Sequence, residues 1–509
     1  MIKCGINQEL RRLERIDSSA RIRKLRHVDS LRKRRMKTCD VGENVAGMGN
    51  SMEQESKLAQ QTDPETETSI QKPDSCTSSL RKDLLGMIAS MERPSFEEKL
   101  AGMRAVRKLL SHGSVHKLPV KDAVDAGCLP FCFEFLKLHQ HPEIQLEAVW
   151  ALTNIASVPG FCEAAYNRGM VLDLVAPLLY SSNHSIHDTA IWLVGNLAGE
   201  SIEYQTAIFR QSRIVQGILG SLQNPPTVDI LKTATWCMSN LCRHAPDVCD
   251  VARFIPTIRD IIGSCKQHQV VTDACHSICY LAQASSEMAN MIVNTGMCLV
   301  MGARLSVTPG HADDWLVPCI KTLGFLASKC SSRGQRESIL TDYFCRMNKL
   351  MEYFKLSVQK AAFVSLAQVT NDGSLDTIQI FIQTPMLPRR IIQQFDTADF
   401  SVRQQAMIVI ANLSQNECAL KALLQYGLFE SVCNRLDAED TKILLLALQV
   451  LQRIINLDPA EYVSKIESCY KLPTLERLMS HPHQQISSTA EHLYEIISQP
   501  VEDVEMKEY

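Results

Sequence analysis

A short segment recurs through most of this chain, and it limits the fold more than any other feature. Three clear copies, AVWALTNIA, AIWLVGNLA and ATWCMSNLC, occupy residues 148–156, 190–198 and 234–242. Weaker copies lie at 274–281, 320–326, 363–369, 407–413 and 450–454. With Asn154 as the marker position, successive copies are 40 to 45 residues apart. A fixed period of this length is the sequence signature of a repeat protein.

The period and the pattern within each copy predict an all-α fold. About 40–47 residues is the length of HEAT and armadillo units, and each copy has the apolar i, i+3, i+4 spacing of a helix. Breaks that contain Gly, Pro or Asn separate the copies, as in the segment NPP at 224–226. Because such a unit cannot bury its apolar face alone, it stacks on its neighbours. We therefore expect about ten repeats in one armadillo-type, right-handed superhelical solenoid.

Composition excludes several other classes of protein. A chain with 45% hydrophobic and 21% charged residues can bury a large core. Its longest apolar runs, such as residues 443–448, are far shorter than the ~20 residues of a membrane helix. The start of the chain is rich in arginine and has no apolar signal stretch, so the 19 cysteines are expected to be reduced and mostly buried. We find no phosphate loop, no catalytic motif and no metal-ligand spacing, so we expect neither an enzyme nor a cofactor.

Charge divides the chain into four parts. Residues 1–40 hold 13 Lys and Arg against 5 Asp and Glu, whereas the rest of the chain has a net charge of −11. Residues 41–80 are rich in Ser, Thr, Gln and Glu and lack apolar periodicity, which predicts a flexible linker. We expect the solenoid at 81–498 and an acidic tail at 499–509.

Each clear copy places a tryptophan four residues before an asparagine. Residues four apart share one face of a helix, so in a solenoid these pairs fall into two parallel rows. A tryptophan by itself is most simply a core residue, but a core position does not favour asparagine. An asparagine amide can pair with the N–H and C=O of an extended backbone, and indole faces accept the stems of Lys or Arg. Acidic side chains at Glu200 and Asp273 are placed to receive the ammonium groups. The rows predict an extended, Lys/Arg-rich peptide ligand.

These segments resemble the second, third and fourth armadillo repeats of importin-α, the adaptor that carries proteins with nuclear localisation signals. The resemblance covers nearly the whole chain. It implies a major signal-binding site in the concave groove, made by the three Trp/Asn pairs with Glu200 and Asp273. The pairs are Trp150 and Asn154, Trp192 and Asn196, and Trp236 and Asn240. Glu200 stands where the family has an Asp, and Val158 and Glu163 replace small residues, a departure that affects the affinity for the key lysine.

The minor signal site of the family is degenerate in this chain. Its tryptophan positions fall at Val364 and Ile408, and Lys321 stands where the family has an Arg. Of its asparagines only Asn412 is kept, while Gln368 and Phe325 replace the others. The resemblance therefore implies a weakened or absent minor site, and a signal with two basic clusters should bind little better than one with a single cluster.

The two ends of the chain also resemble the family. The basic arm matches its importin-β-binding segment, in which the basic residues here are Arg11, Arg12, Arg32, Lys33, Arg34 and Arg35. By the same resemblance the arm competes with signals for the groove, which is autoinhibition. The last repeat and the acidic tail resemble the region bound by the CAS-type exportin. The implied location is both cytoplasm and nucleus, with no membrane or nucleic-acid partner.

Three alternatives remain open at this point. A β-catenin-like armadillo scaffold would bind acidic or helical partners through a basic groove. A nucleic-acid-binding protein would act through residues 1–40 and would show steep salt dependence. A divergent relative of importin-α would retain cargo in the cytoplasm or act on chromatin without active transport.

Overall fold

The chain is helical throughout the part that the structure describes. The computed structural model describes residues 75–112, 118–158, 160–244, 246–305 and 314–498, all within the unit Asp74–Tyr509, and these ranges contain no strand. The first helices are α2 (Ser75–Glu92), α3 (Phe96–His112), α4 (Leu118–Asp125), α5 (Cys128–Leu136), α6 (Pro142–Ala156), α7 (Cys162–Tyr166), η1 (Asn167–Gly169), α8 (Met170–Val175), η2 (Ala176–Tyr180), α9 (His184–Ala198), α10 (Ile202–Arg210), α11 (Ser212–Gln223), α12 (Val228–Leu241), α13 (Val248–Val251), η3 (Ala252–Phe254), α14 (Ile255–Ser264) and α15 (His268–Ala284). They are followed by α16 (Ser286–Asn294), α17 (Met297–Leu305), α18 (Leu316–Lys329), α19 (Arg333–Leu350), α20 (Leu356–Thr370), α21 (Leu375–Gln383), α22 (Leu387–Thr397), α23 (Phe400–Leu413), α24 (Glu417–Leu424), α25 (Leu428–Cys433), α26 (Thr441–Leu457), α27 (Pro459–Ser468), α28 (Leu472–Met479) and α29 (Gln484–Ser498).

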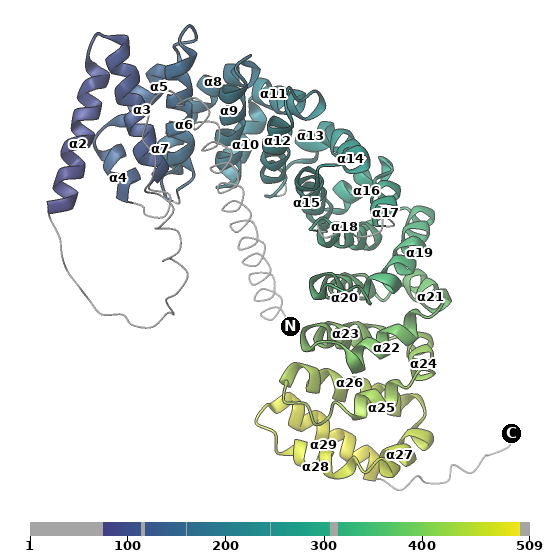
Figure 1. Cartoon of the computed structure of the whole chain (residues 1–509). Helices are drawn as coiled ribbons and strands as arrows, with labels where there is room; N and C mark the ends of the chain where they lie inside the picture. The colour runs from purple at the N-terminus through teal and green to yellow at the C-terminus, as the bar shows by residue number, and fades with distance from the viewer. Residues whose placement is uncertain (1–74, 113–117, 159, 245, 306–313, 499–509) are drawn as a thin grey trace, which may run out of the picture. The chain divides into compact units, whose positions relative to one another are not determined.

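One long helix of each repeat carries the recurring sequence segment. These long helices are α6, α9, α12, α15, α18, α20, α23 and α26, and each packs against the next one in the series. The series continues to α3 at one end and to α29 at the other. From α15 to α26 the long helices follow one side of the stack, and helices such as α14, α16, α19, α21 and α24 follow the opposite side (Figure 1). The predicted armadillo-repeat solenoid is thus confirmed.

Local sequence explains where the long helices begin. The side chain of Asn183 accepts hydrogen bonds from the backbone N–H groups of Ser185 and Ile186 at the start of α9. Thr227 and Asp440 cap α12 and α26 in the same way, and Pro142 stands in the first turn of α6, where its missing N–H costs nothing. These caps satisfy backbone donors that a helix start leaves without a partner.

The core is continuous along the stack because each long helix buries residues against both neighbouring repeats. On α9, for example, Ile186, Ala190, Leu193 and Leu197 are all buried. One repeat departs from the common pattern, because the single helix α19 stands where most other repeats have two shorter helices before the long one. Buried apolar surface between neighbouring repeats is the main source of stability in such an arrangement.

The described residues also bear on the segment boundaries and on the cysteines. Helix α2 begins at Ser75, so it takes in the end of the segment that we expect to be a linker, and α29 ends at Ser498. Residues 1–40 and 499–509 lie outside the described part. No described helix is long and apolar enough to cross a membrane, and no group of three His, Cys, Asp or Glu side chains in the described ranges is placed to hold a metal ion. The described cysteines are free thiols, and most of them are buried.

Candidate peptide-binding face

The candidate site lies on one side of the long helices, which we call the long-helix face. Two rows of side chains run along it. The marker row contains Asn154, Asn196, Asn240, Tyr280, Phe325, Gln368, Asn412 and Arg453. The preceding row, one helical turn earlier, contains Trp150, Trp192, Trp236, His276, Lys321, Val364 and Ile408. Because equivalent helices stack, the structure brings the predicted Trp and Asn positions together on α6, α9 and α12.

Asparagines in the marker row link one repeat to the one before it. Asn196 Nδ2 donates to the carbonyl oxygen of Thr153 at 3.1 Å, and Asn240 Nδ2 donates to that of Gly195 at 2.9 Å. In both cases the acceptor is the residue just before the marker position of the preceding repeat. Each such hydrogen bond is worth ~0.5–1.5 kcal/mol. The amide therefore has a structural role between repeats that the sequence alone did not reveal.

The same hydrogen bond recurs in the C-terminal repeats. Asn412 Nδ2 donates to the Ala367 carbonyl at 2.8 Å, and Arg453 Nη1 donates to the Ala411 carbonyl at 2.7 Å. At the other end of the row, Asn154 Nδ2 donates to the Ser111 hydroxyl at 3.0 Å. A donor at the marker position thus links neighbouring repeats at Asn154, Asn196, Asn240, Asn412 and Arg453, and it is not confined to the repeats with tryptophan.

The amide of Asn196 keeps an unused acceptor. Asn196 has an exposed fraction of 0%, and its buried Oδ1 atom has no hydrogen-bond partner among the described residues. A buried carbonyl oxygen without a donor costs free energy, so this atom is a natural acceptor for an incoming N–H group. The bond from Nδ2 to Thr153 fixes the direction in which Oδ1 points.

Two of the three indoles are almost fully covered in the full-length chain. Trp192 is 3% exposed and Trp236 is 2% exposed. Part of the cover of Trp236 comes from the preceding repeat, because a Cβ atom added at Gly195 would lie 2.3 Å from Trp236 Cζ3. The absence of a side chain at Gly195 lets the indole lie directly against α9. The sequence predicts that the indole faces accept Lys or Arg stems, and in the full-length chain Trp192 and Trp236 are buried beside the marker asparagines.

Trp150 differs from the other two because it is half-buried and faces a cation of its own chain. The guanidinium carbon of Arg107, on α3, lies 4.4 Å from the centroid of the Trp150 ring. Arg107 is itself held by Glu147 on α6, with Nε 2.6 Å from Oε2, and both side chains are largely buried. This pair shows that an indole of the preceding row accepts a guanidinium over its face.

The predicted acidic residues occupy different environments. Glu200 is exposed just after the end of α9, whereas Asp273 is buried within α15. Glu163, which replaces a small residue of the family pattern, accepts a hydrogen bond from the hydroxyl of Tyr204. Burial, together with this carboxylate, raises the pKa of the Tyr204 phenol well above its ordinary value, so the hydroxyl stays protonated and keeps donating.

The predicted minor site is differently composed on α18, α20 and α23. Lys321 is exposed, and Gln368 and Asn412 are half-buried. At the tryptophan positions, Val364 and Ile408 are half-buried aliphatic residues. Phe325, in place of an asparagine, is buried, and its ring lies 5.8 Å from the Lys329 ammonium. The preceding row therefore offers no aromatic face on these three helices.

Several residues that shape the face were not found by sequence reasoning. Gly195 and Thr153 are the acceptors of the inter-repeat bonds, and Arg107 covers Trp150. A signal for Gly195 existed, since it precedes Asn196 directly and is the only glycine in the three clear copies. The predicted importin-β-binding residues, from Arg11 and Arg12 to Arg35, lie outside the described residues.

Known proteins similar to this chain agree on the kind of repeat. Residues 117–157 match the family model described as the armadillo/beta-catenin-like repeat. The crystal structure of an engineered protein from the Northeast Structural Genomics Consortium superposes with a TM-score of 0.69 over 82% of this chain and 99% of its own, at 20% sequence identity. At that identity the likeness bears on the fold alone.

Similar curated proteins extend over almost the whole chain. Importin subunit alpha-4 of Arabidopsis thaliana is 25% identical over 510 residues, which cover 97% of this chain and 90% of that protein. Importin subunit alpha-1b of Oryza sativa subsp. japonica is 24% identical over 82% of this chain and 80% of its own length. Importin subunit alpha-5 of Arabidopsis thaliana is 27% identical over 73% of each chain. With its armadillo repeats, the chain is similar to these importin alpha subunits over most of its length.

Proposed function

We propose that this protein is a nuclear import adaptor that binds Lys/Arg-rich nuclear localisation signals on the long-helix face from α6 to α15. Its relatives named importin subunit alpha support the general role, because they align with up to 97% of the chain. The residues proposed to bind the signal are the three Trp/Asn pairs with Glu200 and Asp273. The proposed second partner, importin-β, binds the basic arm at 1–40.

The observation that carries the proposal is the orientation of the Asn196 amide. Its Nδ2 atom donates to Thr153, while its buried Oδ1 atom accepts no hydrogen bond from any residue that the structure describes. An extended peptide running along the stack presents one N–H group to such an acceptor, and the next repeat offers a similarly anchored amide at Asn240. Main-chain hydrogen bonds of this kind hold a peptide without regard to its side chains, which suits a family of different signals.

Neighbouring side chains supply the preference for cations. Glu200 is exposed one turn after Asn196, and the long helices of this region also carry the carboxylates of Asp188, Asp229 and Asp273. An ammonium or guanidinium group is attracted both to carboxylates and to indole faces. The contact of Arg107 with Trp150 is an internal example of the same interaction.

The burial of Trp192 and Trp236 in the full-length chain requires that signal binding uncovers them. We propose that the basic arm, through Arg32 to Arg35, competes with signals for this face. Deleting residues 1–40 should then raise the affinity for a Lys-rich peptide. It should also make tryptophan fluorescence more sensitive to iodide quenching. No change in either quantity would reject autoinhibition.

The direct test compares two asparagines that make the same inter-repeat bond. Asn196→Ala removes the bond to Thr153, and Asn412→Ala removes the equivalent bond to Ala367 and a second one, to the Thr370 hydroxyl at 3.3 Å, so Asn412→Ala should lose at least as much stability. Fluorescence anisotropy with a labelled Lys-rich peptide should show a loss of affinity of about 3- to 10-fold for Asn196→Ala only. Equal losses for the two variants would mean that Asn196 acts through the stack alone and would contradict the proposed site.

The remaining partners follow from the same proposal. A pull-down with importin-β should succeed with the full-length chain and fail without residues 1–40. Steeply salt-dependent binding of that arm to RNA, with no binding to importin-β, would favour the nucleic-acid alternative. Recycling by a CAS-type exportin is assigned to the last repeat, around α29, and to residues 499–509.

A further inference from the structure

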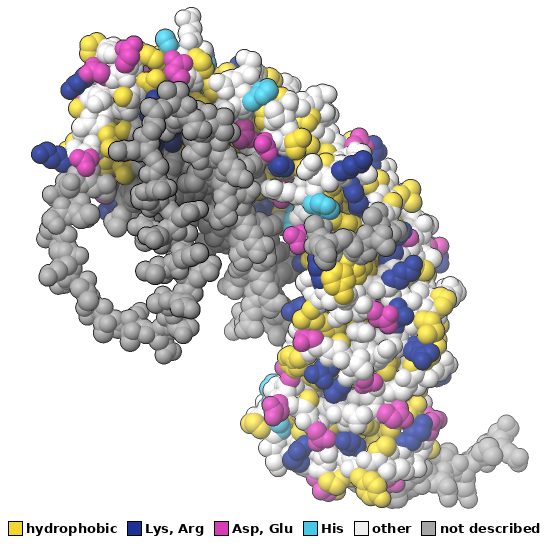
Figure 2. All heavy atoms as spheres, in the orientation of Figure 1, with side chains coloured by type: hydrophobic (Ala, Val, Ile, Leu, Met, Phe, Trp, Pro, Cys, Tyr) yellow, Lys and Arg dark blue, Asp and Glu magenta, His cyan; other side chains and the backbone are white. Residues whose placement is uncertain are grey.

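The charge of the long helices reverses sign halfway along the stack. The helices α6, α9, α12 and α15 carry one Lys and no Arg, and their carboxylates are Glu143, Glu147, Asp188, Asp229 and Asp273. The helices α18, α20, α23 and α26 contain no Asp or Glu, and their cations are Lys321, Lys329, Lys360, Arg403, Lys442 and Arg453. The reversal is specific to the long helices, since acidic and basic side chains are mixed over the C-terminal helices seen in Figure 2.

Three of these cations lie on the long-helix face itself. Lys321 belongs to the preceding row and is exposed, and Lys360 is exposed one helical turn before Val364. Neither lysine forms an ion pair with a described residue. Arg453, in the marker row, directs its guanidinium at the carbonyl of Ala411, a neutral partner that leaves its charge in place.

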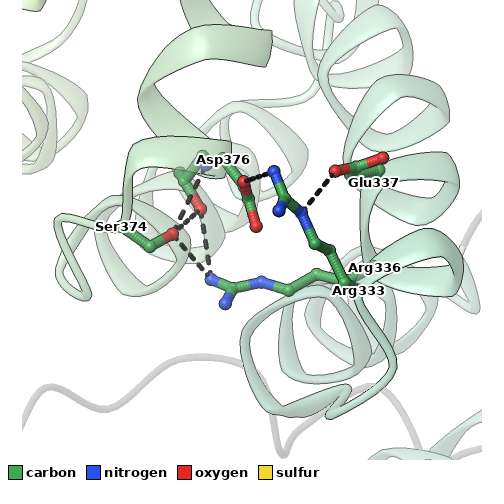
Figure 3. Close-up of polar contacts among 6 residues, drawn as sticks. Arg333, Arg336, Glu337, Ser374 and Asp376 are labelled. Carbon is green, nitrogen blue, oxygen red and sulfur yellow. Dashed lines mark hydrogen bonds and ion pairs between the residues drawn. The ribbon is translucent and has the colours of Figure 1, made fainter.

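Carboxylates near this part of the face are already engaged. Asp399 caps α23 by accepting from the Ser401 N–H at 2.9 Å, and hydrogen bonds from Ser401, followed by the charges of Arg403 and Lys360, lower the pKa of this carboxyl. On the opposite side of the stack, which α19 and α21 follow, Asp376 pairs with Arg333 at 3.1 Å, a contact drawn in Figure 3, and Asp372 pairs with Arg336. The excess of positive charge on the face is therefore not cancelled by these groups.

Aliphatic side chains separate the cations. Val364 and Ile408 occupy the tryptophan positions on α20 and α23, and both are half-buried. We call Lys321, Lys360, Val364, Ile408 and Arg453 together the C-terminal strip. A ligand that matches it carries negative charges spaced by apolar groups, which is the reverse of a nuclear localisation signal.

We propose that the C-terminal strip binds an extended acidic segment of a partner protein, with carboxylates at Lys321 and Lys360 and apolar side chains on Val364 and Ile408. Charge complementarity selects the occupant. Single-stranded nucleic acid is less suited to the strip, because its bases stack on exposed aromatic rings and the strip presents none. This inference concerns helices other than those of the proposed signal site, so either site can exist without the other.

The test uses the full-length chain and a labelled synthetic peptide in which Glu alternates with Leu and Ser. In fluorescence anisotropy at low salt, the double variant Lys321→Gln/Lys360→Gln should bind this peptide about five- to tenfold more weakly than the parent. The control is Lys232→Gln/Lys421→Gln, which removes two exposed or half-buried lysines away from the strip and should leave the affinity unchanged. Because the basic arm is present in every variant, its own attraction for the peptide cancels in the comparison.

Further measurements separate the strip from the other binding surfaces of the chain. Ile408→Ser should also weaken acidic-peptide binding, whereas neither strip variant should change the affinity for a Lys-rich peptide. Equal affinity of parent and double variant would overturn the proposal. So would displacement of the acidic peptide by oligothymidylate at equal concentration, which would assign the strip to nucleic acid. Binding that appears only after deletion of residues 499–509 would assign the strip to the chain's own acidic tail and would also overturn it.

Discussion

The contact between Gly195 and Trp236 offers a sharp test of how neighbouring repeats build the face. A Cβ atom at position 195 would lie 2.3, 2.9 and 3.1 Å from three ring carbons of Trp236. Real Cβ atoms do not approach other heavy atoms as closely as the first of these distances. Because Trp236 is only 2% exposed, its ring cannot swing into solvent without disturbing other contacts. The substitution Gly195→Ala must therefore move α12 away from α9 or force the indole off its rotamer.

The expected cost combines two opposite effects. Overpacking of a buried contact costs ~1–3 kcal/mol, while replacing glycine by alanine inside a helix gains up to ~1 kcal/mol. Movement of α12 also weakens the 2.9 Å bond from Asn240 to the Gly195 carbonyl. We expect a net loss of about 1–2 kcal/mol in the free energy of unfolding, and a weaker affinity for a Lys-rich peptide.

Gly220→Ala is the matched control. Gly220 also lies inside a helix, α11, but it is exposed and an added Cβ atom would meet nothing within 4 Å. This variant should gain about 0.5–1 kcal/mol from helix propensity alone. Urea denaturation followed by circular dichroism compares the midpoints of the two variants with that of the parent. A Gly195→Ala protein as stable as Gly220→Ala, with unchanged peptide affinity, would refute the reasoning.

Other consequences of the structure can be checked independently. Glu147→Ala leaves the buried Arg107 without its carboxylate, so thermal unfolding should show a loss of about 3 kcal/mol or more in the free energy of unfolding. The control Glu134→Ala breaks an exposed pair with Lys137 and should change this free energy by less than about 1 kcal/mol. The Nε2 atom of His187 lies 2.8 Å from the Ser221 hydroxyl, and burial lowers the pKa of this imidazole. Because the unfolded chain then binds the proton more tightly than the folded chain, the free energy of unfolding should fall as the pH drops from about 6.5 through the folded-state pKa. His187→Gln should flatten this part of the pH profile, and an unchanged profile would contradict the assignment. Fluorescence anisotropy should give dissociation constants within about threefold of each other for signal peptides with one and with two basic clusters, because Val364 and Ile408 replace the aromatic residues of the second site. A much higher affinity for the two-cluster peptide would contradict a degenerate minor site.

The repeat architecture was predictable because its signal is a period. The recurrence of Asn154 every 40 to 45 residues fixes which helices stack, and the structure confirms the helical repeats. Side-chain partners between repeats were less accessible to sequence reasoning. The bond from Asn196 to Thr153 depends on the vertical offset of α9 on α6, which no local pattern encodes. A buried amide needs hydrogen-bond partners. The Nδ2 atom of Asn196 has one within the stack, at Thr153, whereas its Oδ1 atom has none among the described residues.

Burial of the indoles was beyond sequence reasoning for a related reason. The distance between Trp236 and Gly195 in the sequence is 41 residues, and only the stacking of α12 on α9 brings them together. The reversal of charge at α18, in contrast, can be read from the sequence once the long helices are known. Net charge counted over whole segments conceals it, because carboxylates of the shorter helices offset the cations of the long ones.

The central claim is that a cationic peptide lies along α6, α9, α12 and α15. The most direct measurement is photo-crosslinking of a Lys-rich peptide with a photoreactive residue at its centre, using the full-length chain with and without residues 1–40, followed by mass spectrometry of the linked fragments. We predict crosslinks to α9 and α12, near Asn196 and Asn240, that become stronger when the arm is removed. Crosslinks confined to α18, α20 and α23, or to the opposite side of the stack, would contradict this claim.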